Sequence, residues 1–311
     1  MKISKSDILL FSCIRNEQYR LESFLEHYRT IGVNYFFFID NGSEDDTVNF
    51  LLSQNDTYIF QTEESYAESN FGMNWIHELL SKFSVGNWTL IVDADELFIY
   101  PYFEKVGIHL LAEYLDAANA DSVKSFLLDM YANKPIINTQ YISGESFIKT
   151  CPYFDKDTYS FEKGILLKKK NAVPVRGGVR HRLFWNGFNR KKPSPVLKKF
   201  PFIKWSDDHH FKASTHDINH NTEASITGIL LHFKLISRFY DYSKKESNRN
   251  EHWDNAAQYK SYWDVLKKNR SLNPYFEGSI RYKNSQQLID LNLMHVSKKF
   301  NQFIEKHVNH S

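Results

Sequence analysis

W-T-L-I-V-D-A-D-E-L-F-I-Y, the segment from Trp88 to Tyr100, is the stretch that decides the fold class of this chain. It opens with an apolar run of the length expected for a buried strand. Three carboxylates follow at once, Asp93, Asp95 and Glu96. Because an unpaired charge is costly to bury, these side chains should lie where the strand leaves the core. In open α/β sheets ligands bind at that end of the strands, so the segment predicts a strand leading into a site.

Two earlier segments repeat this pattern of an apolar strand followed by polar residues. Asp7–Ile14 ends in the polar set Arg15–Glu17, and Val33–Ile39 ends in the acidic run Asp40–Asp46. Helical periodicity lies between the strands, which predicts parallel βαβ units. Because parallel strands end at the same edge of a sheet, the three polar sets should converge there.

Composition and charge exclude some classes of protein. The formal net charge is only +2, which does not indicate a nucleic-acid-binding protein. The segment 161–200 is locally basic, with twelve Lys and Arg against the single acid Glu162. It could face a diphosphate, an anionic acceptor or a membrane surface, or it could be a solvated face. Two cysteines, Cys13 and Cys151, form no disulfide framework and fit a reducing compartment.

No segment of the sequence has the pattern of a signal peptide or a membrane span. The longest apolar runs have about eight residues, far short of the ~20 that a spanning helix needs. We therefore expect a cytoplasmic protein that is soluble or peripheral on the cytoplasmic face of the membrane. Its attachment could come from the basic segment 161–200 and the amphipathic tail 285–308, although we expect the tail rather to pack on the domain or on a second subunit.

The order and spacing of several motifs resemble those of a known family. The motifs are C-I-R-N-E (13–17), F-L-E-H-Y-R-T-I-G-V (24–33), F-I-D-N-G-S-E-D-D-T (38–47) and I-V-D-A-D-E-L-F (91–98). With them the chain resembles the bacterial branch of the family 2 glycosyltransferases with the nucleotide-sugar-dependent GT-A fold, the branch with a D-N-G-S loop and a D-A-D-E segment. Weaker similarity continues through R-G-G-V-R-H-R-L-F (176–184) and L-L-H-F-K (230–234).

The resemblance implies a fold class and a division of the chain. It implies an α/β, GT-A-like protein with a mixed, mostly parallel sheet flanked by helices and a C-terminal helical extension. The catalytic domain would span 1–235, with a nucleotide-binding half in 1–100 and an acceptor and active-site half in 101–235. Residues 236–311 would form the helical extension.

The resemblance also implies site residues. Asp40 would accept a hydrogen bond from the N3–H of a uracil-like base, and Glu17 with its neighbour Arg15 would line the nucleoside pocket. Asn41 stands where the commonest loop has an acid, which leaves the base less certain. Asp93 and Asp95 would bind Mn²⁺ or Mg²⁺ together with the diphosphate of a nucleotide sugar, most simply a UDP-sugar. A strand end with solvated acids is the competing interpretation of this pair.

The remaining ligands can be argued from residue chemistry. His216 and His232 are candidates for a third metal ligand, and His216 is favoured because His232 lies in an apolar run that suits a core histidine. A general base for the acceptor hydroxyl could be Asp155 or Asp129. Arg176 and Arg180, beside two glycines and together with Arg182, could hold phosphates in bidentate contacts, or they could form a salt-bridge network within the loop.

The sequence therefore predicts a metal-dependent glycosyltransferase that moves a sugar to a glycan or lipid-linked acceptor, as in polysaccharide biosynthesis. Two alternatives remain open at this stage. A sugar-phosphate nucleotidyltransferase would use the same acids, cation and nucleotide pocket but would release pyrophosphate. A non-catalytic carbohydrate-binding protein of the same fold would bind glycan without metal-dependent nucleotide binding.

Overall fold

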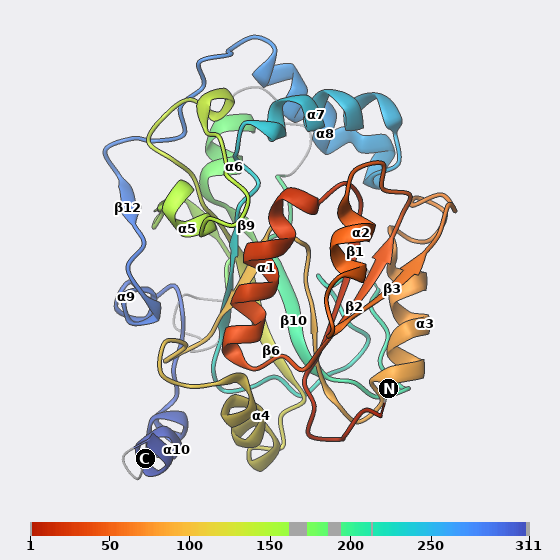
Figure 1. Cartoon of the computed structure of the whole chain (residues 1–311). Coiled ribbons are helices and arrows are strands. Elements are labelled where there is room, and N and C mark those ends of the chain that lie inside the picture. The colour runs from red at the N-terminus through yellow and green to blue at the C-terminus, as the bar shows by residue number, and fades with distance from the viewer. Residues whose placement is uncertain (1, 162–172, 186–193, 213, 309–311) are drawn as a thin grey trace.

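A mixed β-sheet runs through the molecule in the computed structural model, which describes residues 2–161, 173–185, 194–212 and 214–308 (Figure 1). Within these residues eight strands form the main sheet, in the order β3-β2-β1-β4-β10-β6-β11-β5. The strands are β1 (Leu9–Ile14), β2 (Tyr35–Asp40), β3 (Thr57–Gln61), β4 (Trp88–Ile91), β5 (Glu96–Ile99), β6 (Ser122–Asp129), β10 (Lys198–Lys204) and β11 (Gly228–His232).

The direction of the strands brings many strand ends to one edge. Parallel pairing joins β1, β2, β3 and β4, and it also joins β6 and β11. Strand β10 is antiparallel to both β4 and β6, and β5 is antiparallel to β11. The carboxyl ends of the parallel strands therefore share an edge with the first residues of β10 and β5. We call it the carboxyl edge.

Helices cover both faces of the sheet because side chains alternate along each strand. On one face, Leu10 of β1 packs in a core with α1 (Gln18–Ile31) and α4 (Ile108–Ala117). On the other, Leu9 and Phe11 pack with α3 (Met73–Phe83). Helix α1 ends at Gly32, whose φ of 105° is the left-handed conformation that glycine adopts without strain. The short helix α2 (Thr47–Leu52) contacts β3 and α1.

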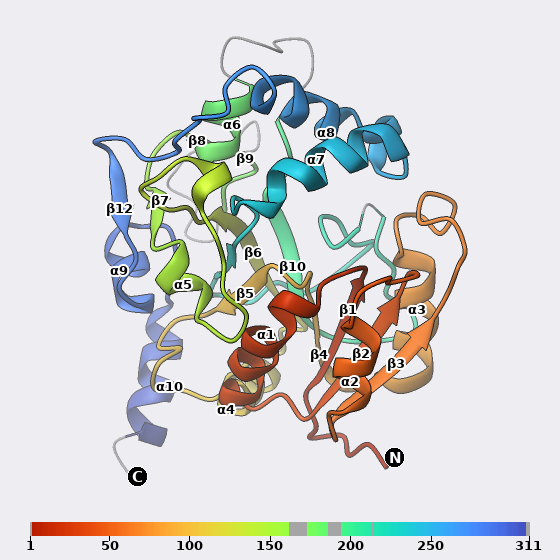
Figure 2. The same ribbon diagram turned by 45° about the horizontal axis from the view of Figure 1, so that its top comes forward.

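A second group of helices lies beyond the carboxyl edge. In both views α6 (Gly178–Phe184), α7 (Arg238–Arg249) and α8 (Trp253–Leu266) lie above the ends of the parallel strands (Figures 1 and 2). They are held by an aromatic core that contains Phe184, Phe239 and Tyr262 and reaches Tyr131 just after β6. The carboxyl edge is therefore covered by the second half of the chain.

The remaining elements all follow β6 in the chain. These elements are η1 (Ile136–Asn138), α5 (Phe147–Thr150), β7 (Tyr153–Asp155), β8 (Tyr159–Ser160), β9 (Arg176–Gly177), β12 (Ser279–Arg281), α9 (Ser285–Asp290) and α10 (Lys298–Val308). Strand β12 pairs with β7, and β8 pairs with β9. The C-terminal region thus contributes a strand as well as helices, and the division at residue 235 stays a prediction.

The predicted fold class, an α/β protein with a mixed, mostly parallel sheet flanked by helices, is confirmed. Three details differ from the sequence interpretation. The sequence predicts no separate strand at β5, and over 131–225 it predicts only loops and short strands, which does not identify β10 as a strand of the main sheet. The apolar spacing of residues 66–82 predicts a helix, but helix α3 begins only at Met73, because the preceding residues form a looped turn in which Phe71 has a positive φ. The tail expected as one helix over 285–308 is broken into α9 and α10.

The apolar side chains of the tail pack on the domain. Leu288, Met294 and Phe300 are buried in the same core as α1 and α4. They are therefore not exposed for membrane attachment. In the part of the chain that the structure describes, no helix has both the length and the apolar character to cross a bilayer.

Candidate active site at the carboxyl edge

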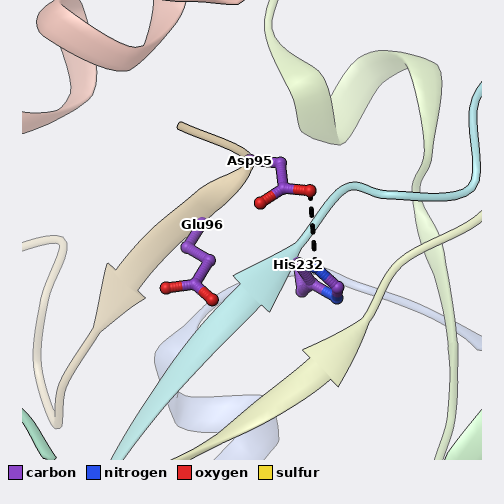
Figure 3. Close-up of side chains that lie close together, drawn as sticks. All are labelled: Asp95, Glu96 and His232. Atoms are coloured by element: carbon purple, nitrogen blue, oxygen red, sulfur yellow. Dashed lines mark ion pairs between the residues drawn. The ribbon is translucent and has the colours of Figure 1, made fainter. Parts of the chain in front are cut away.

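Three side chains that could hold a metal ion meet at the carboxyl edge, and we call them the metal-ligating cluster: Asp95, Glu96 and His232 (Figure 3). Glu96 begins β5 and His232 ends β11, and the antiparallel register places these two residues opposite one another. Asp95 lies in the turn just before β5, and one of its carboxylate oxygens, Oδ2, is 3.4 Å from Nε2 of His232. One ligand atom from each residue lies within 4.8 Å of the others. Carboxylate oxygens with an imidazole nitrogen form a donor set that suits Mn²⁺.

Lys199 already engages one member of this cluster. Its ammonium, at the start of β10, lies 2.6 Å from Oε1 of Glu96 and 3.0 Å from Oδ2 of Asp93. The backbone N–H of Asp93 donates to the other oxygen of Glu96. Since both oxygens of Glu96 have partners, Asp95 and His232 are the two side chains best placed to bind a cation.

Asp93 and Asp95 do not share a face as an extended strand would require. The chain turns after β4, with the N–H of Glu96 donating to the carbonyl of Asp93. As a result the Asp93 side chain is 62 % exposed and turned to Lys199, whereas Asp95 is buried against His232. The role of Asp93 as a metal ligand stays a prediction.

His232 is held from its other side by Asp129 at the end of β6. The two residues are opposite one another on neighbouring parallel strands. Nδ1 of His232 lies 2.5 Å from Oδ1 of Asp129, and Nε of Arg180 donates to Oδ2 of the same carboxylate at 2.8 Å. The four side chains Asp95, His232, Asp129 and Arg180 therefore form a continuous buried chain of polar contacts.

The charges of the site oppose the effect of burial. Burial would raise the pKa of Asp95, but His232 and Arg20 outweigh it and hold that pKa well below its usual value. Burial likewise favours neutral His232, but the carboxylates of Asp95 and Asp129 raise its pKa overall. Glu96 differs, because burial and the Asp93 charge raise its pKa to about 7.

The residues predicted to bind the nucleoside also lie at this edge. Asp40 is buried and accepts hydrogen bonds from the backbone N–H and the hydroxyl of Ser43. The Asn41 amide donates to the carbonyls of Thr62 and Glu64, so it orders the loop after β3. These contacts fix the loop after β2, and the contact of Asp40 with a base stays a prediction.

The predicted residues after β1 are held by ion pairs. Arg15 pairs with Glu44 at 3.2 Å, which joins the loops after β1 and β2. Glu17 pairs with Arg20 at 2.8 Å. Burial raises the pKa of Glu17, and the charge of Asp95 raises it further. The backbone N–H of Glu17 donates to the Thr47 hydroxyl, which ties Glu17 to the segment after β2.

The predicted general base Asp155 lies in a separate ion pair. Its carboxylate accepts two hydrogen bonds from Arg182, each 2.9 Å, and one from the Tyr131 hydroxyl at 2.5 Å. It is 1 % exposed. Arg182 and Arg180 therefore form salt bridges, as the alternative interpretation of the arginine segment predicts. Asp155 and Asp129 are both buried, which does not favour either of them as a general base that reaches an acceptor. Arg176 lies in the short strand β9 and is partly buried.

His216 is close to the cluster but is not a member of it. Its Nδ1 lies 2.6 Å from the carbonyl oxygen of Lys198. Burial and the charge of Lys199 lower its pKa to about 4. The ring is therefore neutral at physiological pH. It is His232 that faces Asp95 in the structure. The sequence favoured His216 because His232 lies in an apolar run that suits a core histidine.

Sequence reasoning missed the cations around the acids, chiefly Lys199, Arg20 and Lys234. Arg20 follows Glu17 at a spacing of one helical turn, which is a signal that could have been used. Lys199 carries no comparable signal, because its partners Asp93 and Glu96 are about a hundred residues away in the sequence. The part of the basic segment in 162–172 and 186–193 lies outside the described residues.

No protein-family model and no curated protein match this chain. Solved structures do match part of it. One is glucosyl-3-phosphoglycerate synthase from Mycobacterium tuberculosis in complex with Mn²⁺, UDP and glucosyl-3-phosphoglycerate, at 19 % identity and TM-score 0.27, covering 39 % of this chain and 44 % of that chain. Another is 4-diphosphocytidyl-2C-methyl-D-erythritol synthase, at 15 % identity and TM-score 0.28, covering 45 % of this chain and 65 % of that chain. The match thus spans less than two thirds of either structure, and similarity at this level does not identify a substrate.

Proposed function

We propose that this protein is a metal-dependent glycosyltransferase that uses a nucleotide-diphosphate sugar. The observation that carries the proposal is the pairing of Asp95 and His232 at the carboxyl edge, beside the exposed carboxylate of Asp93. A nucleotide diphosphate brings phosphate oxygens that complete the coordination of a divalent cation. The loops after β1 and β2 lie at the same edge, where they could receive the nucleoside.

Each group at the edge has a distinct task in this proposal. Asp95 and His232 would hold Mn²⁺ or Mg²⁺, and the cation would supply positive charge opposite the leaving diphosphate. The ammonium of Lys199 holds Asp93 and Glu96 in place. Arg20 and Lys234 add positive charge near Asp95, and this charge lowers the pKa of Asp95. The donor would therefore enter an environment in which its negative charge is balanced from several sides.

The donor and the acceptor are assigned only by class. The family resemblance assigns Asp40 to a uracil-like base, and the acceptor would be the hydroxyl of a glycan or of a lipid-linked precursor. An inner-membrane substrate would bring the protein to the cytoplasmic face of the membrane. The burial of the tail leaves the basic segment as the candidate contact with anionic lipid.

The test is nucleotide binding with and without metal, followed by product analysis. Uridine, guanosine, thymidine and cytidine diphosphates are titrated calorimetrically into the protein in the presence and absence of Mn²⁺. We expect one of them to bind in a Mn²⁺-dependent way, and we expect the corresponding nucleotide sugar to yield free nucleoside diphosphate. Release of pyrophosphate would identify a nucleotidyltransferase instead, and metal-independent binding of every nucleotide would overturn the proposal.

A matched pair of variants tests the metal ligand. Asp95→Asn should abolish Mn²⁺-dependent binding and turnover, because a neutral amide is a poor ligand for a hard cation. The control is Asp116→Asn, since Asp116 contacts Trp88 at the opposite end of β4. The control should retain both activities. Wild-type turnover in Asp95→Asn with an unchanged metal requirement would refute the assignment.

A further inference from the structure

We infer that Asp129 is a positioning residue that fixes His232 for metal binding, in place of the general-base role that the sequence suggested. The inference rests on the proposed function, because it assigns a task toward the same cation. It concerns a residue that would not touch the cation, the nucleotide or the acceptor. Asp129 would act only through the imidazole of His232.

The geometry divides the two ring nitrogens of His232 between two partners. Nδ1 lies 2.5 Å from Oδ1 of Asp129, and Nε2 lies on the side of Asp95, 3.4 Å from its Oδ2. A neutral imidazole that donates its Nδ1–H to Asp129 presents the lone pair of Nε2 to the position beside Asp95. The contact with Asp129 therefore selects the tautomer that can bind a cation there.

Asp129 is itself held rigidly. Its second oxygen, Oδ2, accepts a hydrogen bond of 2.8 Å from Nε of Arg180, and the two side chains are 3 % and 4 % exposed. Both oxygens of Asp129 thus have partners, and water has little access to either. A carboxylate in this state cannot take a proton from an acceptor without breaking two contacts, whereas it can fix the plane of the ring beside it.

The backbone supports the same conclusion. Asp129 and His232 end neighbouring parallel strands and are opposite one another in the register, while Glu96 faces His232 from the other side. The ring is therefore placed by three adjacent strands rather than by a loop. In metal sites a carboxylate behind a histidine typically contributes ten- to hundredfold in metal affinity, because it orients the ring and raises its basicity.

The same helix provides a matched comparison. Arg182 of α6 pairs with Asp155 much as Arg180 pairs with Asp129, and both carboxylates are buried. The partners of Asp155 are Arg182 and the Tyr131 hydroxyl, so no histidine lies between Asp155 and the metal-ligating cluster among the contacts of the described residues. A variant of Asp155 removes an equivalent buried charge without disturbing His232.

The experiment measures Mn²⁺ affinity, independently of turnover. Mn²⁺ is titrated into wild-type protein, Asp129→Asn and Asp155→Asn, and free Mn²⁺ is followed by electron paramagnetic resonance. We expect Asp129→Asn to bind Mn²⁺ about ten- to hundredfold more weakly than wild type. We expect Asp155→Asn to lose stability but to keep the wild-type Kd within about twofold.

A second measurement does not depend on the folding of Asp129→Asn. Long-range ¹H–¹⁵N correlation spectra of metal-free wild-type protein at alkaline pH report which nitrogen of each neutral histidine carries the proton. We expect the proton of His232 on Nδ1, with its resonance assigned by its loss in His232→Gln. A proton on Nε2 would overturn the inference, and so would an unchanged Mn²⁺ Kd in Asp129→Asn. Absence of Mn²⁺ binding by the wild type would instead refute the proposed function on which the inference rests.

Discussion

Replacing Lys199 by methionine removes the one ammonium that contacts both Glu96 and Asp93 in the described structure. The side chains of Lys199 and Glu96 are 5 % and 1 % exposed, so their contact is a buried ion pair. Methionine fills a similar volume but leaves the carboxylate of Glu96 buried without its cation. Removal of one partner of a buried pair typically costs about 3–5 kcal/mol. Asp93 adds little to this loss because it is 62 % exposed.

The same strand offers a control. Lys204 at the other end of β10 pairs with Asp116 at 2.8 Å, but these side chains are 39 % and 46 % exposed. An exposed pair of this kind is worth at most about 1 kcal/mol. We therefore expect Lys199→Met to be destabilised far more than Lys204→Met. Adding Glu96→Gln to Lys199→Met should restore most of the stability lost at pH 8, because the stranded charge is then absent.

The loss should also depend on pH. Burial and the charge of Asp93 raise the pKa of Glu96 to about 7 in the folded protein. A carboxyl whose folded pKa lies above its unfolded value of about 4.3 stabilises the protein fully below that value. This contribution is lost as the pH rises toward 7. Without Lys199 the folded pKa rises further, so the difference between variant and wild type should be small at pH 5.5 and large at pH 8.

Urea unfolding followed by tryptophan fluorescence, at both pH values, measures these differences. The reasoning would be refuted if Lys199→Met lost no more stability at pH 8 than Lys204→Met does. It would also be refuted if the loss were the same at pH 5.5 and pH 8, because the charge state of Glu96 would then not be the cause.

Three further predictions test the structure away from the metal-ligating cluster. Burial lowers the pKa of His27 to about 4 despite its contact with the Phe98 carbonyl. The free energy of unfolding should therefore fall as the pH drops from about 6.5 to 4, by roughly 1.4 kcal/mol per pH unit. Urea unfolding midpoints of His27→Gln should lack this pH-dependent loss. Burial raises the pKa of both Cys13 and Cys151 to about 12. Neither thiol should therefore react appreciably with iodoacetamide at pH 8, which mass spectrometry measures. Rapid modification of either thiol would contradict its burial. A Cβ at Gly228 would lie 2.5 Å from the Phe98 ring. Gly228→Ala should therefore be destabilised by about 1–3 kcal/mol, as thermal unfolding measures. An unchanged melting temperature would show that the packing around Gly228 relaxes easily.

Local sequence patterns predicted the parallel half of the sheet well. The apolar runs around Leu9–Ile14, Tyr35–Asp40 and Trp88–Ile91 are strands, and the acids after them lie at one edge. This was predictable because alternation and strand-end polarity are properties of a few consecutive residues. Helix α1 was predictable for the same reason, since its apolar spacing and its terminating Gly32 are local.

The site required the pairing of distant strands. The choice of His232 over His216 depends on β11 lying between β6 and β5, which brings His232 between Asp129 and Glu96. The position of Lys199 depends on β10 being inserted antiparallel between β4 and β6. Strand order is set by the burial of whole faces and by long connections, so no short window of sequence encodes it.

By itself, the sequence determined that polar and acidic residues follow buried strands, because a charge cannot remain in the core without a partner. Only the tertiary structure decided which partners those charges have. Asp129 and Asp155 look alike in the sequence as acids at strand ends, yet one contacts a histidine of the metal-ligating cluster and the other an arginine and a tyrosine. The physical reason is that a buried carboxylate takes its function from the groups that compensate its charge, and these come from strands and helices far away in the chain.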